Sequence, residues 1–533
     1  MTVPSRAIPP QRFWEHPALL AALVLLTAVP LLWPETPPLV DLPGHIGRYR
    51  IQLGLEAGSS PLARYFGFEW ALIGNLGVDL LIEPLARLIG LEPAVKLIVT
   101  TIPMLTVAGL LLVAREIHGR VPPTAFFALP LAYGFPFQFG FVNFALSMAL
   151  ALLAFVLWLR LGRSGRIGMR AALFVPISCL IWLCHTFGWG LLGLLAYAGE
   201  VADERDRRGA GRPAAFFRGG LHCLPLALPF LLMLMWRTGA VSGVTMDWFN
   251  WDAKGRWMIG ILHERWEWWD KAGAALLIAL PLLAIVQIGF RIRHVAVLAT
   301  LFMLIIFTLL PRILFGSAYA DMRLAPYMVA IAVIGLRPKG WAERHLSTPL
   351  ALAGLAFFAA RLTVSTATFA DIDRVWRGQL AALDQIAVGS RVLVQVNVPC
   401  SRAWRSDRVD HIGSFAIARR EAFTNDQWAM AGAQLVTVRY RAGAPFVVDP
   451  SQMMRPPGCR GYGEMSLTRT LRALPTDAFD YLWLIDLPRA GWPRRPDLIP
   501  VWNGGERGIL YRFADSATSA SDTPNGSAAR PSR

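Results

Sequence analysis

The segment VNFALSMALALLAFVLWLR, residues 142–160, is apolar throughout except for single Asn, Ser and Arg side chains. A helix needs about twenty predominantly apolar residues to cross the roughly 30 Å hydrocarbon core of a bilayer. Comparable runs recur from the N-terminus to about Phe369 and then stop. The sequence therefore predicts a polytopic α-helical membrane protein.

Composition points to the same fold class. Of the 533 residues, 55% are hydrophobic and 17% are charged, and the mean hydropathy is +0.44. Ordinary soluble domains carry about 25% charged residues. We expect a transmembrane domain over residues 1–369, a soluble domain over 370–513, and a disordered tail over 514–533, which is rich in small and polar residues.

The candidate spans number eleven: 17–33, 94–114, 121–138, 142–160, 171–184, 188–200, 219–236, 272–290, 295–311, 324–336 and 348–366. With the N-terminus in the cytoplasm, every inside connection is rich in arginine, as the positive-inside rule requires. The first run resembles a signal peptide, but no small-x-small cleavage site precedes Pro34, so we interpret it as a retained helix. With eleven spans and a cytoplasmic N-terminus, residues 34–93, residues 237–271 and everything after Phe369 are predicted to lie outside the cytoplasm.

The outside segments have patterns of their own. In the first loop we expect a helix over 44–57 and an interfacial helix over 76–91. The second loop is rich in tryptophan, which is typical of an interfacial aromatic belt or, alternatively, of a platform for carbohydrate or lipid headgroups. After Phe369 helical and extended patterns alternate, which predicts a small α/β domain. Cys400 and Cys459 lie there, and a disulfide between them is an open alternative.

The first candidate site follows the first span, in Val40-Asp41-Leu42-Pro43-Gly44-His45-Ile46-Gly47-Arg48. A carboxylate held beside apolar helices is partly desolvated, which raises its pKa and makes Asp41 a candidate general base. The alternative is that Asp41 caps the helix that begins near Gly44. His45 and Arg48 are candidate binding residues, and Glu69 is a candidate second acid or a solvated loop residue.

The second candidate site is the outside segment between the ninth and tenth spans. It contains Arg312, Tyr319, Asp321 and Arg323, and its two arginines break the positive-inside trend. Binding of a phosphate would explain them, whereas an Asp321–Arg323 pair or contact with lipid phosphate is the alternative. His185, at the outer end of the fifth span, is either a packing residue or a group that orients a phosphate or an acceptor hydroxyl.

In its predicted spans, outside loops and candidate site residues, the chain resembles the multi-spanning GT-C glycosyltransferases that use polyprenyl-phosphate sugars. The resemblance consists of Asp41 in the first large outside loop, interfacial helices in that loop, and a soluble domain after the last span. It implies a GT-C-like fold, Asp41 as the base that deprotonates the acceptor, and Arg312 and Arg323 at the lipid phosphate. Asp41 is followed by Leu42 rather than by a second acid, so we predict no metal and no cofactor.

We therefore expect a glycosyltransferase of the cytoplasmic membrane that transfers a sugar from a polyprenyl-phosphate donor to a glycan or lipid acceptor outside the cytoplasm. The alternatives are a transporter or flippase, and a non-catalytic protein whose outer domain binds a ligand. The formal charge of +16 sits mainly in loops between apolar runs, so it does not indicate nucleic acid. The sequence has no Walker loop, His-Glu-x-x-His or Cys-x-x-Cys motif, which disfavours an ATP-driven pump or a zinc protease.

Overall fold

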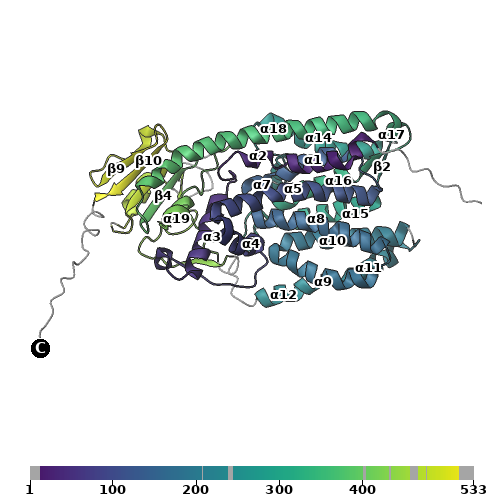
Figure 1. The fold of residues 1–533 in the computed structure, drawn as a ribbon, viewed down its shortest axis with the longest axis horizontal. Helices are drawn as coiled ribbons and strands as arrows, with labels where there is room; N and C mark the ends of the chain where they lie inside the picture. Colours follow the sequence, from purple (N-terminus) through teal and green to yellow (C-terminus); the bar gives the residue numbers. More distant parts are fainter. Residues whose placement is uncertain are drawn as a thin grey trace, which may run out of the picture. The chain divides into compact units, whose positions relative to one another are not determined.

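A computed structural model of the chain describes residues 12–206, 208–237, 244–287, 289–399, 404–430, 434–455, 466–475 and 477–514 (Figure 1). The chain divides into two compact units. The helical unit comprises Met1–Leu42, Trp70–Asp373 and Met430–Ala433, and the mixed unit comprises Pro43–Glu69, Arg374–Ala429 and Gln434–Arg533. Cys400, Cys459 and the predicted tail after Ala514 lie outside the described residues.

The helical unit is built from helices joined by short connections. They are α1 (Pro17–Leu26), α2 (Val29–Leu32), α4 (Gly77–Ile89), α5 (Leu91–His118), α6 (Ala125–Ala128), α7 (Phe135–Phe139), α8 (Val142–Arg163), α9 (Ile167–Cys184), α10 (Thr186–Asp206), α11 (Arg212–His222), α12 (Leu228–Arg237), α13 (Trp251–Ile259), α14 (Glu267–Val286), α15 (His294–Leu309), α16 (Ala320–Ile334), α17 (Trp341–His345) and most of α18 (Ser347–Leu380). A two-stranded ribbon of β2 (Phe290–Ile292) and β3 (Leu336–Pro338) completes it.

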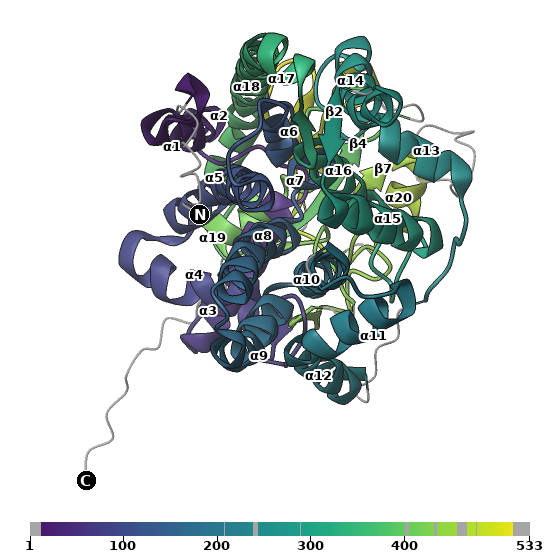
Figure 2. The same cartoon turned by 90° about the vertical axis from the view of Figure 1, so that its right-hand side faces the viewer.

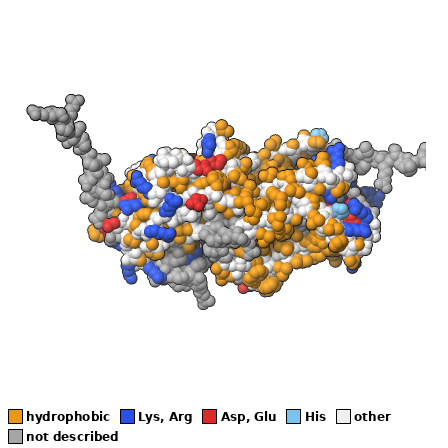
Figure 3. All heavy atoms as spheres, turned by 90° about the horizontal axis from the view of Figure 1, so that it is seen from below, with side chains coloured by type: hydrophobic (Ala, Val, Ile, Leu, Met, Phe, Trp, Pro, Cys, Tyr) orange, Lys and Arg blue, Asp and Glu red, His pale blue; other side chains and the backbone are white. Residues whose placement is uncertain are grey.

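Five helices of the described chain are long and apolar enough to span a membrane: α5, α8, α9, α14 and α18. The bent pair α11 and α12 gives a sixth if it is one span, and shorter apolar helices cover Pro17–Leu32, Ala125–Phe139 and His294–Leu309. Hydrophobic side chains cover the face of the unit that Figure 3 shows. These features fit a multi-pass membrane protein, as the sequence predicted.

The predicted span 121–138 is not one continuous helix. It forms α6, the 3₁₀ turn Leu129–Tyr133 and α7. The segment contains four prolines and one glycine. Proline lacks an amide donor and clashes with the preceding turn, so a continuous helix cannot form there. The break leaves backbone groups of α7 available to neighbouring segments.

Helix α8 runs through the interior of the unit and packs against α5, α9 and α10, which surround it in Figure 2. Small residues allow close approach. A Cβ added to Gly109 of α5 would lie 2.7 Å from Leu152, and one added to Gly188 of α10 would lie 2.5 Å from Ser147. Small residues at helix crossings are typical of membrane bundles, where van der Waals packing replaces the hydrophobic effect.

A buried ionic cluster joins α18 to the start of α14. The Arg361 guanidinium donates to Asp270 at 2.5 Å and to Glu264 at 3.3 Å, and Ser365 donates to Glu264 at 3.0 Å. Arg361, Glu264 and Asp270 are each at most 4% exposed. Loss of one partner from such a cluster would leave an uncompensated charge, at a cost of about 3–5 kcal/mol.

The mixed unit contains a six-stranded sheet in the order β5-β4-β8-β10-β9, with β7 also paired to β4. Its strands are β4 (Arg391–Asn397), β5 (Phe423–Thr424), β7 (Met453–Met454), β8 (Tyr481–Ile485), β9 (Leu498–Asn503) and β10 (Gly508–Phe513). Strand β4 runs parallel to β5, β7 and β8, whereas β10 runs antiparallel to β8 and β9. Helices α3 (Leu42–Glu56), α19 (Ser414–Arg420) and α20 (Leu467–Ala473) accompany the sheet.

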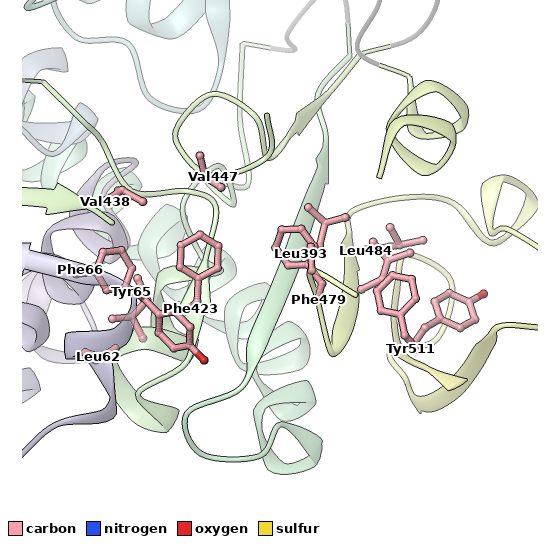
Figure 4. Close-up of a cluster of buried hydrophobic side chains, with 14 of the residues drawn as sticks. Leu62, Tyr65, Phe66, Leu393, Phe423, Val438, Val447, Phe479, Leu484 and Tyr511 are labelled. Carbon is pink, nitrogen blue, oxygen red and sulfur yellow. The ribbon is translucent and has the colours of Figure 1, made fainter. Parts of the chain in front are cut away.

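Residues 43–69 fold with the mixed unit, although they lie within the predicted transmembrane domain, residues 1–369. Strand β1 (Phe66–Phe68) pairs antiparallel with β6 (Val436–Val438). Leu62, Tyr65 and Phe66 join the buried cluster around Leu393 and Phe423 that Figure 4 shows. Burial of these side chains favours this unit because each large apolar side chain contributes about 1.5–3 kcal/mol.

A polar segment follows β5 and is nevertheless buried. The Asn425 carbonyl oxygen Oδ1 accepts from the Val394 amide of β4 at 2.8 Å. Asp426 Oδ1 accepts from Thr424 at 2.6 Å and from Ser414 at 2.9 Å, and Gln427 donates to the Gly44 carbonyl at 3.1 Å. The segment therefore links the sheet, α19 and α3, although Asp426 Oδ2 has no hydrogen-bond partner among the described residues.

Asp426 predicts a specific dependence of stability on pH. Burial raises the pKa of this carboxyl, against smaller opposing effects of His411, Thr424 and Ser414. The native state therefore binds this proton more tightly than the unfolded chain, whose aspartate pKa is about 3.9. The stabilisation that this tighter proton binding gives the native state is complete below the unfolded pKa, and it is lost as the pH rises through the pKa of Asp426 in the folded protein. We expect Asp426→Asn, which keeps the Oδ1 acceptor, to gain thermal stability relative to the wild type as the pH rises from about 4 to 7.

The measurement is the denaturation midpoint of the purified full chain in detergent at several pH values. Asp384→Asn is the control, because the Asp384 side chain is 79% exposed and pairs with Arg420. If the difference in denaturation midpoint between Asp426→Asn and the wild type does not change with pH, the pKa of Asp426 is not raised in the folded protein.

Candidate functional site

Asp41 lies at the end of the segment that connects α2 to α3, beside the loop that follows α7. The Asp41 amide donates to the Phe139 carbonyl at 2.9 Å, and the Val40 amide donates to the Gln138 carbonyl at 3.3 Å. These bonds use carbonyls that the short helix α7 leaves free at its end. Asp41 directly precedes the first residue of α3, the position that the capping alternative requires. The side chain is half-buried.

Gly140 allows the two segments to lie this close. Its φ is 102°, a region that favours glycine. A Cβ at this position would lie 2.8 Å from the Asp41 amide nitrogen and 3.1 Å from the Asp41 Cβ. The loop therefore fixes the backbone of Asp41 from one side.

Arg323 lies in the first turn of α16 and is 8% exposed. Its guanidinium carbon is 4.1 Å from the centre of the Phe141 ring and 5.9 Å from those of Phe144 and Phe187. It donates to the Ser317 hydroxyl at 3.1 Å. The carboxylate of Asp41 is close enough to interact electrostatically with this guanidinium.

His185 lies at the junction of α9 and α10, in the same neighbourhood. Its ring centre is 5.7 Å from those of both Phe144 and Phe187. It also interacts electrostatically with Arg323. Its Nδ1 accepts from the Phe187 amide at 3.1 Å, which holds the ring at the start of α10. The structure thus brings Asp41, Arg323 and His185 together within the helical unit.

Arg312 and Tyr319 form the edge of this neighbourhood. The Arg312 Nε is 2.9 Å from Asp247 Oδ2, and its guanidinium carbon is 5.8 Å from the centre of the Tyr319 ring. The Tyr319 ring lies 5.3 Å from that of Phe139 and 5.6 Å from that of Trp257, measured between centres. Phe139 thus contacts both Tyr319 and the Asp41 backbone.

The two loops that carry Arg312 and Asp247 have an unusual backbone. Met246 pairs with Ile313 in a single antiparallel bridge. Among the described residues of these loops, four have positive φ without being glycine: Asp247, Phe249, Phe315 and Tyr319. Such conformations cost about 1–3 kcal/mol each and cluster at functional sites and ligand clamps.

Asp321 belongs to a structural ion pair. It lies 3.4 Å from the Lys254 ammonium, and the two side chains are 1% and 3% exposed. Lys254 also donates to the carbonyls of Phe307 and Leu310 at 2.7 and 2.8 Å. Lys254 therefore caps the C-terminal end of α15 and ties it to α16, which leaves Asp321 little freedom to bind a ligand.

His45, Arg48 and Glu69 belong to the mixed unit. The His45 ring lies 5.1 Å from the Trp428 ring, measured between centres, and Arg48 donates to Gln434 at 2.7 Å. The Glu69 amide donates to the Leu435 carbonyl, and its side chain is exposed. Close contacts of Gly44 with Trp428 and of Gly47 with Gln427 explain the two glycines of the motif. The motif therefore divides, with Asp41 in one unit and His45 and Arg48 in the other.

Three further buried polar residues of the helical unit were not among the predicted site residues. Asp79 of α4 accepts from Asn143 of α8 at 3.0 Å and is 1% exposed. Lys254 and Gln138 are similarly buried. Asp79 and Gln138 are polar side chains in apolar or aromatic stretches, which is the signal that could have identified them, whereas Lys254 lies between Asp252 and Arg256 and has no such signal. Within the described ranges, no group of three or more His, Cys, Asp or Glu side chains is arranged to hold a metal ion.

The geometry around Asp41 predicts the effect of Gly140→Ala. This change adds a backbone clash to the cost of a positive φ, so it should displace the Asp41 segment and lower the denaturation midpoint of the detergent-purified chain. Gly119→Ala is the matched control, since Gly119 also has a positive φ of 75° but nothing within 4 Å of its added Cβ. We expect Gly119→Ala to cost about 1–2 kcal/mol and Gly140→Ala to cost more. Equal losses would contradict a contact between Gly140 and Asp41.

Comparison with known proteins identifies no family for this chain. No protein-family model matches it, and no curated protein matches it closely enough to indicate a relative. The functional conclusion therefore rests on the arrangement of Asp41, Arg323 and His185.

Proposed function

We propose that the chain is an integral-membrane glycosyltransferase that transfers a sugar from a polyprenyl-phosphate donor to a glycan or lipid acceptor. The observation that carries this proposal is that the Asp41 carboxylate lies near enough to the buried Arg323 guanidinium to interact with it electrostatically, while Arg323 and His185 share contacts with Phe144 and Phe187. A base for the acceptor hydroxyl and a cation for the leaving phosphate are groups that favour glycosyl transfer from a phosphate ester.

In this proposal Asp41 accepts the proton of the acceptor hydroxyl. The acceptor oxygen forms a bond to the anomeric carbon while the bond from that carbon to the phosphate oxygen breaks. Polyprenyl phosphate leaves with the bonding electrons. Arg323 offsets the charge that develops on the departing phosphate. The low dielectric around the buried guanidinium strengthens this effect.

The two arginines have different expected roles. Arg323 is surrounded by three phenylalanine rings and interacts with Asp41, so it is our candidate for the leaving phosphate. Arg312 is partly exposed and pairs with Asp247, so a phosphate that binds it must compete with that carboxylate. The side chains near Arg312 that are exposed and apolar, Met246, Trp248, Phe249 and Trp251, provide surface for the lipid chain.

The membrane placement belongs to the same proposal. We infer a multi-pass protein of the cytoplasmic membrane with eleven spans, a GT-C-like arrangement, and a mixed unit on the non-cytoplasmic side. Support comes from the segments predicted to be inside: Arg120 pairs with Glu15 at 2.6 Å, and Arg337 pairs with Glu343 at 2.7 Å. Arg12 also donates to the Glu343 carbonyl. Three separate basic segments therefore meet at one end of the helical unit, as a shared cytoplasmic location requires.

A flippase or transporter for a lipid-linked sugar is the second candidate. The broken helix at α6 and α7 and the buried charges of Arg361 and Lys254 are features expected of transporters. Glu264, Asp270 and Asp321 lie at or before helix starts, however, and their charges cap or tie helix ends. A flippase would move the lipid without breaking the bond between sugar and phosphate, so measurement of transfer separates the two functions.

The proposal predicts that Asp41→Asn abolishes transfer. The amide is nearly isosteric with the carboxylate but cannot accept a proton, and loss of a general base costs about 10²–10⁴-fold in rate. The measurement is incorporation of label from a panel of radiolabelled polyprenyl-phosphate monosaccharides into acceptors in membranes that contain the full chain.

Asp252→Asn is the control, because Asp252 is an exposed residue of α13. It should transfer at the wild-type rate with equal amounts of protein in the membrane. Wild-type transfer by Asp41→Asn would exclude Asp41 as the base.

A further inference from the structure

Gln138 is an isolated polar side chain in an aromatic environment. It lies in the run Phe135-Pro136-Phe137-Gln138-Phe139-Gly140-Phe141-Val142, in which every other side chain is apolar. It belongs to α7, the last piece of the broken segment, and its carbonyl accepts from the Val40 amide at 3.3 Å. The residue is therefore a direct neighbour of the segment that carries Asp41.

The Gln138 amide has unused hydrogen-bonding capacity. The side chain is 1% exposed. Neither Oε1 nor Nε2 has a hydrogen-bond partner among the described residues. A buried amide in this state is costly, and proteins pair the large majority of their buried side-chain polar atoms. Because both ends are unmatched, exchanging the oxygen and nitrogen positions would not remove the cost.

Three other buried amides of the described chain use their donor groups. Gln395 is also 1% exposed, but its Nε2 donates to the Val394 and Ser451 carbonyls, each at 2.9 Å. Gln427 donates to Gly44 and Ser414, and Asn143 donates to Asn75 and Asp79. Gln138 differs from these three residues because both its oxygen and its nitrogen are unmatched, and it also lies beside the segment of the candidate base.

We propose that Gln138 binds hydroxyl groups of the donor sugar, an inference that rests on the proposed transferase function. A hydroxyl both donates and accepts, so two neighbouring hydroxyls of a sugar ring satisfy Oε1 and Nε2 together. A phosphate oxygen only accepts and would leave Oε1 unmatched. The donor sugar is favoured over the acceptor because its anomeric carbon must lie near both Asp41 and Arg323, whereas the acceptor must place only its reacting oxygen there.

This assignment gives the amide a role in specificity. A site built to hydrogen-bond a hydroxyl rejects an analogue that lacks it, because the buried polar groups then remain unpaired. Gln138 thus selects the sugar, while Arg323 binds the phosphate common to all such donors. The cost of the unmatched amide in the ligand-free protein is offset when the sugar binds.

The first test is thermal stability without ligand. Gln138→Met keeps the length of the side chain and removes the amide, so the midpoint of the purified full chain should stay equal or rise. Gln395→Met is the matched control, and it should lower the midpoint because it leaves two carbonyls without their donor. A loss in Gln138→Met as large as that in Gln395→Met would show that Gln138 has a structural role and would overturn the inference.

The second test is binding of defined lipids to the same proteins. The probes are bare polyprenyl phosphate and polyprenyl phosphates that carry glucose, galactose, mannose, arabinose or N-acetylglucosamine. Gln138→Met should bind the sugar-bearing lipid preferred by the wild type more weakly by about tenfold or more, as expected for the loss of both hydrogen bonds of the amide, and should bind the bare phosphate unchanged.

The outcomes separate this inference from the proposed function. Equal binding of the sugar-bearing lipid by Gln138→Met and wild type would overturn the role of Gln138 and leave the transferase proposal standing. Weaker binding of the bare phosphate as well would overturn the assignment to sugar hydroxyls. Failure of the wild type to bind any sugar-bearing lipid of the panel would overturn both.

Discussion

The electrostatic interaction between Asp41 and the buried Arg323 is the constraint on which the candidate site depends. The two residues lie in segments that are far apart in the sequence, and each would be costly to bury alone. Phe141, Phe144 and Phe187 surround the guanidinium, and the Phe139–Gly140 turn fixes the carboxylate-bearing backbone. An acidic and a basic side chain therefore lie near each other in a largely apolar setting.

The break in the segment 121–138 makes this pairing possible. A continuous helix would use the carbonyls of Gln138 and Phe139 or direct them along its axis. Prolines and Gly134 instead end the helix early, and these carbonyls accept from Val40 and Asp41. The strained loops around Asp247 and Tyr319 lie on the other side of Phe139. Irregular backbone thus concentrates where the polar residues of the site meet, which is the usual place for it in a membrane protein.

Much of the secondary structure was predictable because hydropathy and periodicity report local burial. The predicted spans fall on helical segments, and the mixed sheet after Phe369 agrees with the predicted alternation of helical and extended patterns. Five or six helices of the described chain meet the length and composition that a span requires, so the structure does not confirm the predicted number of eleven. Helix α10 ends among Glu204, Arg205 and Asp206, so its apolar part is short relative to its length.

The composition of the site was harder to predict because neighbours in sequence need not share a unit. Asp41 and His45 are four residues apart, yet α3 packs its glycines against Gln427 and Trp428 of the mixed unit. Arg323 and His185 were recognisable as polar residues at span ends. The role of Asp321 depended on Lys254, a partner 67 residues away, and the unmatched state of Gln138 depends on side-chain contacts that no local pattern reports.

A double-mutant cycle between Asp41 and Arg323 measures most directly whether these two side chains interact. The thermal stability of the full chain would be measured for Asp41→Asn, Arg323→Gln and the double variant. We predict a coupling free energy between the two substitutions of about 1 kcal/mol or more, because removal of one charge leaves the other without the opposite charge nearby. Effects that add to within about 0.3 kcal/mol would contradict the pairing on which the site and its proposed function depend.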